Sequence, residues 1–395
     1  MKKFFLIFIT IFVWRITLPT SIFADEMGIN QLKPEIITEI DQKINPYESS
    51  CTNISLGLVY NGKVVFTKSY GTGSINTVYE WASVSKSLTA LIIMHLTEIN
   101  KITNINDDIW EYADQYSGKM PEHCDDGLDC TNSHLTIKQT MTHTAGFYHV
   151  TDGEPLYTSG KLNLKFRPGT DFYYSTNGYA VLGDVIAGID GISYVQAVQK
   201  YITQVAGTQS LSATSSWIAP GAYVKSNIYD FSLYTAGIIN NKFVTADTLN
   251  EMLTNQTSGF GRDFGLGFRI ENNGTENVAG FHSGSNGIPR SYIYIKPKLK
   301  RSVVVFCQVN SSSNSVNFYT PVRDIEAILA RGNGILAHCQ PLGDIDCNSK
   351  VNAFDFGNLA KYWGLSSYPA ANLDDSGVVD KEDALIFLGN YGKSN

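Results

Sequence analysis

Residues 81–88 read Trp-Ala-Ser83-Val-Ser-Lys86-Ser-Leu, and the interpretation of the whole chain starts from this stretch. It opens a predicted helix, residues 83–99, whose apolar side chains recur every three or four positions. Side chains three residues apart lie on one face of a helix, so Ser83 and Lys86 can meet. A partly desolvated lysine can act as the base that a serine nucleophile needs. The pair alone is more often explained by helix capping and solvent-facing residues, so further motifs are required.

Two later segments strengthen the case for catalysis. Residues 174–177 read Tyr-Ser-Thr-Asn before a predicted helix over 177–189, and residues 282–284 read His-Ser-Gly before a predicted strand over 289–296. In this order the three motifs resemble those of the serine β-lactamase and penicillin-binding-protein superfamily, specifically its class C β-lactamase-related hydrolases. The similarity extends over roughly residues 30–331.

The resemblance implies a serine hydrolase that acts by an acyl-enzyme on ester, amide or lactam carbonyls and needs no cofactor. Its substrate would be a small molecule or a peptide. Ser83 is expected to attack the carbonyl, while Lys86 and Tyr174 share the proton transfers. Tyr174 can serve as a base only if nearby cations lower the pKa of its phenol. The Ser83 amide and an amide on the strand after His282 are expected to form the oxyanion hole.

The same resemblance predicts the substrate-binding residues. They are Thr176, Asn177, His282, Ser283 and Gly284, with Gly284 allowing the substrate backbone to approach the strand. One position departs from the family pattern, because the usual Tyr-x-Asn has Thr176 as its third residue. A hydroxyl lacks the paired donor and acceptor of an amide. This departure supports the alternative that the chain is a non-catalytic binding or scaffold protein. His143, by contrast, is expected to be a structural histidine that hydrogen-bonds its own loop.

The pattern of predicted elements indicates an α+β fold. Asn61-Gly62 joins two β-rich runs within residues 55–69 and is a strong hairpin signal. Helical patterns follow, and strand-like runs return near the end of the domain. We therefore expect an antiparallel sheet flanked by helices plus an all-helical domain. The predicted helices are 137–143, 177–189, 193–204, 228–239, 247–254 and 316–331, and the later strands are 264–270, 289–296 and 301–309.

The last residues of the chain carry a repeated spacing of oxygen-bearing side chains. Two twelve-residue loops begin 28 residues apart, and each runs into a helical stretch, 356–363 and 384–391. This spacing wraps six to eight oxygen ligands around a calcium ion. The expected ligands are Asp344, Asp346, Asn348, Asn352 and Asp355, then Asn372, Asp374, Ser376, Asp380 and Asp383.

A duplicated calcium loop of this kind resembles a type I dockerin module, a small α-helical domain. The resemblance implies a docking partner for residues 340–395. The usual partner-reading Ser/Thr pairs are replaced by Ala353-Phe354 and Lys381-Glu382. The partner is therefore left open as a cohesin-like protein, another surface protein, or none.

The N-terminus and the cysteines indicate an exported protein. Lys2 and Lys3 precede a short apolar run, and Ala24 offers a cleavage site, so residues 1–24 read as a signal peptide. We expect a hydrolase domain over 25–335, a docking domain over 340–395, and a secreted, periplasmic or cell-surface location without a transmembrane anchor. Six cysteines favour disulfides over a metal site, with Cys124–Cys130 first and Cys339–Cys347 second. A net charge of −7 argues against a nucleic-acid partner.

Overall fold

The computed structural model describes residues 26–271, 278–311, 315–337, 351–361, 363–364, 371, 373 and 378–394. The predicted signal peptide lies outside the described residues, as does Cys339–Cys347. Among the described residues, no single helix is long and apolar enough to cross a membrane. Only the bent pair Thr176–Asp190 and Tyr194–Ala206, at 79°, reaches that length and composition together.

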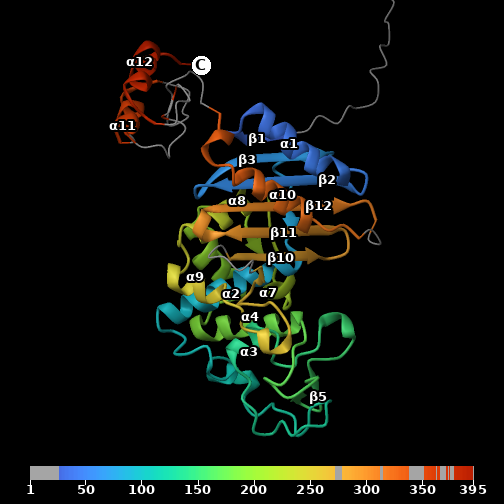
Figure 1. Ribbon diagram of the computed structural model, residues 1–395. Coiled ribbons are helices and arrows are strands. Elements are labelled where there is room, and N and C mark those ends of the chain that lie inside the picture. Colours follow the sequence, from blue (N-terminus) through green and yellow to red (C-terminus); the bar gives the residue numbers. More distant parts are fainter. Residues whose placement is uncertain are drawn as a thin grey trace, which may run out of the picture.

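A seven-stranded antiparallel sheet organises the domain, as the sequence predicts (Figure 1). Its order is β1-β3-β2-β12-β11-β10-β9, so strands from the two ends of the domain pair at its centre. The hairpin between β2 and β3 turns at Asn61 and Gly62, both with positive φ, as a type I′ turn needs. The strands are β1 (Glu26–Asn30), β2 (Cys51–Tyr60), β3 (Lys63–Gly71), β9 (Arg269–Glu271), β10 (Ala279–Ser285), β11 (Pro289–Lys296) and β12 (Arg301–Val309).

Alternating side chains on the central strands build two cores, one on each face of the sheet. On β12, Val303 and Val305 join the core under α1 (Pro34–Ile44) and α10 (Tyr319–Leu329), whereas Val304 and Phe306 join the core of the helical part. Both faces are covered, so the strands read as nearly continuous apolar runs. The helix α8 (Ile228–Ile239) packs directly on the second face, where Ser302 Oγ donates to Thr235 Oγ1 at 2.8 Å.

The helical part lies beside the β10 edge of the sheet (Figure 1). Its central helix, α2 (Ser85–Glu98), is buried nearly all round, although the sequence predicts only one apolar face. The helices α4 (Thr176–Asp190) and α7 (Ala219–Ala222) pack against it. The helical part also contains α3 (Ile137–Met141), α5 (Tyr194–Val198), α6 (Gln204–Ala206) and α9 (Ala246–Met252). A π-helical turn, Gln199–Thr203, joins α5 to α6. The helical part also carries two small sheets. One has three strands in the order β4 (Tyr79–Glu80), β8 (Val224–Ser226) and β7 (Ser212–Ala213), and the other pairs β5 (Tyr157–Thr158) with β6 (Lys161–Leu162).

The expected strand over 264–270 is wrong for most of its length, because only Arg269–Glu271 pairs in the sheet. The motif at 282–284 precedes the strand over 289–296, as expected, but it also lies in a strand of its own, β10, which was not predicted because its glycines carry little β-propensity.

Two disulfides are present in the described part of the chain. Cys124–Cys130 confirms the first predicted pair. Cys51–Cys307 joins β2 to β12, a pairing that the sequence left open among many.

The described residues between 351 and 394 form two helices, α11 (Ala353–Lys361) and α12 (Lys381–Asn390). Both begin three residues earlier than predicted. Val351 and Val379, which are 28 residues apart, are buried in one small apolar cluster, as are Leu359 and Phe387. Gly392 N–H donates to Val351 O at 2.8 Å and Gly364 N–H to Val379 O at 2.7 Å, again with the same 28-residue offset. The repeat seen in the sequence is therefore a repeat of structure.

Candidate active site

Ser83 lies in a single 3-10 turn, Ala82–Val84, immediately before α2. Trp81 anchors this turn: its N–H donates to Val224 O at 2.8 Å, its indole donates to Ser226 Oγ at 2.9 Å, and its carbonyl accepts from Ser291 Oγ. Ala82 has a φ of 46°, a conformation that is costly for a residue with a Cβ. The surrounding contacts hold this strained turn in place, and it presents Ser83 to a cavity.

Lys86 is completely buried behind Ser83. Its Nζ lies 3.3 Å from Ser83 Oγ and donates to Gly221 O at 2.7 Å and to Thr176 Oγ1 at 3.1 Å. Burial disfavours the ammonium form and lowers the pKa of Lys86 to about 7. A neutral amine has two N–H donors in this site, and Gly221 and Thr176 accept them. Its lone pair is then left to face the Ser83 hydroxyl.

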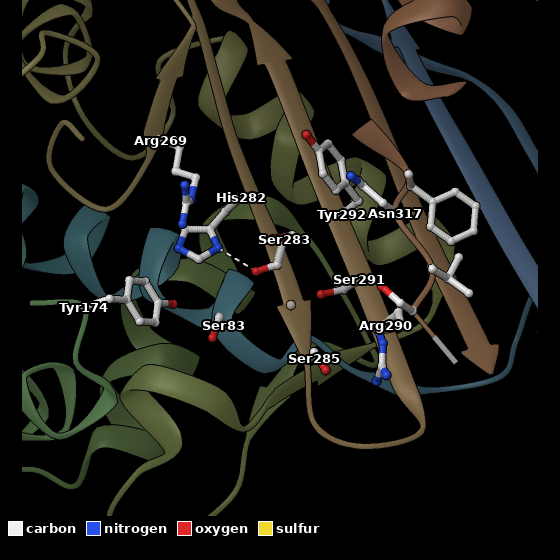
Figure 2. Close-up of a pocket in the computed structure, with 14 residues that line it drawn as sticks. Ser83, Tyr174, Arg269, His282, Ser283, Ser285, Arg290, Ser291, Tyr292 and Asn317 are labelled. Atoms are coloured by element: carbon white, nitrogen blue, oxygen red, sulfur yellow. Dashed lines mark hydrogen bonds between the residues drawn. The ribbon is translucent and has the colours of Figure 1, made fainter. Parts of the chain in front are cut away.

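Tyr174 lies beside Ser83, and its hydroxyl points toward that residue (Figure 2). The Lys86 Nζ sits 4.8 Å from the centroid of its ring. Burial raises the pKa of Tyr174. The Ser83 hydroxyl and the Arg269 charge lower it by less, so the pKa lies above the ordinary value of a phenol. The condition under which Tyr174 could act as a base is therefore not met. Lys86 is the group suited to accept the Ser83 proton.

Three imidazoles surround the Tyr174 ring. The centroids of His143, His149 and His282 lie 4.3, 5.7 and 6.1 Å from that of Tyr174. Burial, and then the Lys86 charge, lower the pKa of all three, that of His282 to about 3. The rings are therefore neutral near pH 7. His143 Nδ1 accepts the Ser175 N–H at 3.1 Å, which agrees with the structural role expected for it.

A cavity of about 570 Å³ opens in front of Ser83. Of the predicted residues, Ser83, Tyr174, His282, Ser283 and Gly284 line it (Figure 2). The sequence analysis missed other lining residues: Arg269, Ser285, Arg290, Ser291, Tyr292 and Asn317. They lie on strands or loops outside any motif, so no sequence signal marked them. The described lining contains two arginines and no carboxylate.

Gly284 has a structural reason to be glycine. A Cβ at this position would lie 2.2 Å from Trp81 O and 3.0 Å from the Ala82 Cβ. The absence of a side chain therefore lets β10 pack against the turn that carries Ser83. The sequence analysis assigned the space at Gly284 to the substrate backbone, whereas here the Trp81 carbonyl fills it.

Thr176 and Asn177 are buried in the first turn of α4 and do not line the described cavity. Thr176 Oγ1 lies between two nitrogens, Lys86 Nζ at 3.1 Å and His149 Nε2 at 3.2 Å. His149 was not predicted, because it lies 27 residues from Thr176 and belongs to no motif.

Four of the predicted calcium ligands are described. Asp355 and Asp383 are buried, and each accepts the backbone N–H of another predicted ligand three residues earlier, Asn352 at 2.8 Å and Asp380 at 2.7 Å. Among the described residues, no three or more His, Cys, Asp or Glu side chains gather in a group that could hold a metal ion. The remaining six lie outside the described residues: Asp344, Asp346, Asn348, Asn372, Asp374 and Ser376.

Comparisons with known proteins agree with this geometry. The family described as Beta-lactamase matches residues 40–323. Protein flp of Staphylococcus aureus (strain N315) is 24% identical over 308 residues, which are 65% of this chain and 59% of that protein. The chain thus spans about three-fifths of the length of this curated relative.

Two solved structures share the fold. One is a beta-lactamase/D-alanine carboxypeptidase from Yersinia pestis, at a TM-score of 0.61 and 16% identity, covering 74% of this chain and 99% of that one. The other is a D-stereospecific amidohydrolase from Streptomyces sp., at a TM-score of 0.55 and 18% identity, covering 73% and 98%.

Proposed function

Because the chain belongs to the Beta-lactamase family, we propose that it is a serine hydrolase of the class C-related type that forms an acyl-enzyme on Ser83. One observation carries the proposal. The Lys86 amine, whose pKa burial lowers to about 7, lies 3.3 Å from the Ser83 hydroxyl at the wall of the cavity.

In the proposed reaction Ser83 Oγ forms a bond to the substrate carbonyl carbon, and the Ser83 proton passes to the Lys86 lone pair. The carbonyl π electrons move to its oxygen, where the Ser83 amide and an amide of β10 stabilise the negative charge. Collapse of this intermediate breaks the bond to the leaving group. The proton returns from Lys86 to that group by way of the neutral Tyr174 hydroxyl. Water then hydrolyses the ester on Ser83.

The charge of the cavity favours one substrate class. Arg269 and Arg290 both line it, and the Arg290 guanidinium also donates to the backbone carbonyl of Gly287. Guanidinium groups bind carboxylates with charge-assisted hydrogen bonds. We therefore infer a substrate with a carboxylate near the reacting carbonyl, such as a peptide ending in a D-amino acid. The two proteins of similar structure, a beta-lactamase/D-alanine carboxypeptidase and a D-stereospecific amidohydrolase, support this choice over short neutral esters.

The test compares peptides that differ only in that charge. A peptide ending in D-Ala-D-Ala should be cleaved about tenfold faster than a variant whose terminal carboxylate is replaced by a neutral group that keeps the scissile bond. A short nitrophenyl ester and a cephalosporin complete the panel, and Ser83→Ala should abolish all turnover. A preference for the neutral ester would contradict the proposed substrate class but not the proposal that Ser83 is the nucleophile.

Mass spectrometry after treatment with a fluorophosphonate tests the nucleophile itself. An adduct on Ser83 in the folded protein supports the hydrolase. Its absence would favour the alternative, a lactamase-like binding or scaffold protein that has lost catalysis.

We further propose that residues 340–395 bind calcium and tether the exported hydrolase to a cohesin-like or other surface protein. Two observations support the proposal. Asp355 and Asp383 are buried at equivalent positions of the repeat. Large apolar side chains on and beside the two helices are more than half exposed: Phe354, Phe356, Trp363, Leu385, Leu388 and Tyr391.

Calorimetric titration of the full chain after chelation tests the calcium sites. Two binding events are expected, and Asp355→Asn or Asp383→Asn should each remove one, because a neutral amide is a weaker ligand. Glu382→Gln, an exposed position outside the predicted ligands, is the matched control. The absence of any binding heat would contradict the tether. N-terminal sequencing of the exported chain tests the signal peptide, with Asp25 the expected first residue.

A further inference from the structure

The Thr176 hydroxyl connects the buried base to a histidine at the edge of the site. Its oxygen accepts from Lys86 Nζ at 3.1 Å and lies 3.2 Å from His149 Nε2. Lys86 in turn lies 3.3 Å from Ser83 Oγ. His149 is thus two hydrogen bonds away from the group that activates the nucleophile.

The backbone around His149 determines which ring nitrogen carries the proton. The Thr151 N–H donates to His149 Nδ1 at 3.2 Å, so Nδ1 is an acceptor. In a neutral imidazole the other nitrogen is then the donor. His149 Nε2–H therefore points at Thr176 Oγ1, which accepts from both the imidazole and Lys86 with its two lone pairs.

Charged and titratable groups on every side keep the ring neutral. Burial lowers the pKa of His149 most, the Lys86 charge on α2 lowers it further, and Asp152 on its own segment raises it by less. Tyr174 stacks on the ring at 5.7 Å, and His143 is a third, neutral neighbour. The backbone N–H of His149 donates to Asp152 Oδ2 at 2.8 Å, and this hydrogen bond fixes the backbone of the segment.

We propose that His149 is a positioning residue for acyl transfer: acting through the Thr176 hydroxyl, it holds the Lys86 amine with its lone pair toward Ser83. Thr176 alone lacks an amide's paired acceptor and donor. The threonine oxygen supplies the acceptor for Lys86, and the imidazole N–H, which donates to the same oxygen, fixes the position of that hydroxyl. The inference rests on the proposed hydrolase and adds a residue that no motif identifies.

The rate at which a fluorophosphonate labels Ser83 tests the proposal without knowledge of the natural substrate. In this step the Ser83 Oγ–P bond forms, the P–F bond breaks, fluoride leaves, and the Ser83 proton goes to Lys86. His149→Phe should lower the maximal labelling rate about tenfold, the size of one neutral hydrogen bond, and change the half-saturating probe concentration less than about twofold. His149→Gln should restore most of the rate, because its amide nitrogen can donate to Thr176.

A double-mutant cycle separates positioning from a general structural effect. Thr176→Val should cost at least as much as His149→Phe, because it also removes the acceptor of Lys86. The double variant should cost no more than Thr176→Val alone, because His149 acts only through Thr176. His134→Phe is the control, since His134 is exposed and pairs with Asp108 at 3.0 Å, away from the site. Thermal melts confirm that each variant is folded.

Three results overturn the proposal: a wild-type labelling rate in His149→Phe, losses that multiply in the double variant, or no rescue by His149→Gln. A wild-type protein that gives no Ser83 adduct instead contradicts the hydrolase, and this proposal with it.

Discussion

Lys86 determines how the activity should depend on pH. Burial lowers its pKa to about 7, so the amine is protonated below that pH and cannot accept the Ser83 proton. We expect the rate of Ser83 labelling to rise with pH and to reach half its maximum near pH 7. Rates measured between pH 5 and 9 check this expectation.

Tyr174→Phe is the control for that titration. The variant should label more slowly but with the same midpoint, because burial keeps the phenol protonated in this range. A midpoint near the ordinary lysine value of about 10.4 would show that the amine is not desolvated in solution.

The buried histidines should make the protein sensitive to acid. Burial lowers the pKa of His282 to about 3, whereas in the unfolded chain it returns to about 6.5. Between these values the unfolded state binds more protons, so the free energy of unfolding falls as the pH drops from about 6.5. His282→Gln should lessen this loss, measured as the unfolding midpoint at pH 7, 5 and 4.

His134 gives a comparison of opposite sign. Its hydrogen bond to Asp108 raises its pKa, so its contribution to stability is present at low pH and disappears as the pH rises. His134→Gln should therefore steepen the acid loss slightly. Parallel curves for the wild type and His282→Gln would contradict the role given to His282.

At the scale of elements, the contact between β10 and the nucleophile turn requires a glycine at position 284. A Cβ at Gly284 would lie 2.2 Å from the Trp81 carbonyl oxygen, so Gly284→Ala must displace one element from the other. We expect a loss of about 1–3 kcal/mol in stability and a fall in Ser83 labelling of more than tenfold. Chemical denaturation and the labelling rate measure the two effects.

Gly259→Ala is the matched control, because a Cβ there would meet nothing within 4 Å. If Gly284→Ala labels as fast as this control, the turn does not depend on its contact with β10.

The sequence predicted some elements closely because their pattern is local. The bounds of α8, β11 and β12 agree with the prediction, and Asn61-Gly62 predicts the hairpin between β2 and β3. The strand β10 was not predicted from the sequence. Its Gly280 and Gly284 are needed because neighbouring atoms lie too close for a Cβ, and glycine has a low propensity for strands. Such contacts exist only once distant segments have packed together.

At the scale of the whole molecule, the fold brings together residues that lie far apart in the chain. Ser83, Tyr174 and His282 were predicted to meet because each belongs to a motif, and the structure places all three on one cavity. No motif includes Arg269, Arg290 or His149. Their positions at the site depend on the register of the strands and on the conformation of the loops. Sequence reasoning therefore found the chemistry of the site but not the groups that surround it.

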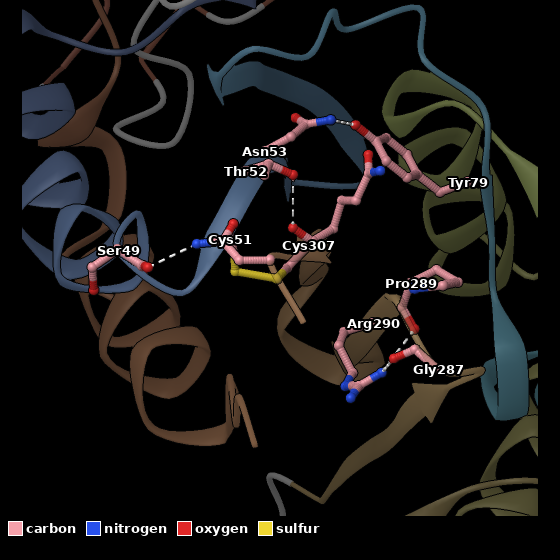
Figure 3. Close-up of a disulfide and its surroundings, with 11 residues drawn as sticks. Ser49, Cys51, Thr52, Asn53, Tyr79, Gly287, Pro289, Arg290 and Cys307 are labelled. Atoms are coloured by element: carbon pink, nitrogen blue, oxygen red, sulfur yellow. Dashed lines mark hydrogen bonds between the residues drawn. A yellow bond between two sulfur atoms is a disulfide. The ribbon is translucent and has the colours of Figure 1, made fainter. Parts of the chain in front are cut away.

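The Cys51–Cys307 disulfide links two of the strands that come from opposite ends of the domain. It joins β2 to β12 across 256 residues, beside the hydrogen bond from Thr52 Oγ1 to Gln308 O at 3.1 Å (Figure 3). Cys124–Cys130 spans only six residues, and the burial of its two cysteines matches that of the first pair. The entropy that a crosslink removes from the unfolded chain grows with the length of the loop it closes. It corresponds to about 5 kcal/mol for the long loop and about 2 kcal/mol for the short one.

Replacing both cysteines by alanine should therefore destabilise the protein more at positions 51 and 307 than at positions 124 and 130. Denaturant unfolding of the two double variants measures the difference, and equal losses would mean that native packing, not loop length, sets the contribution of each bridge.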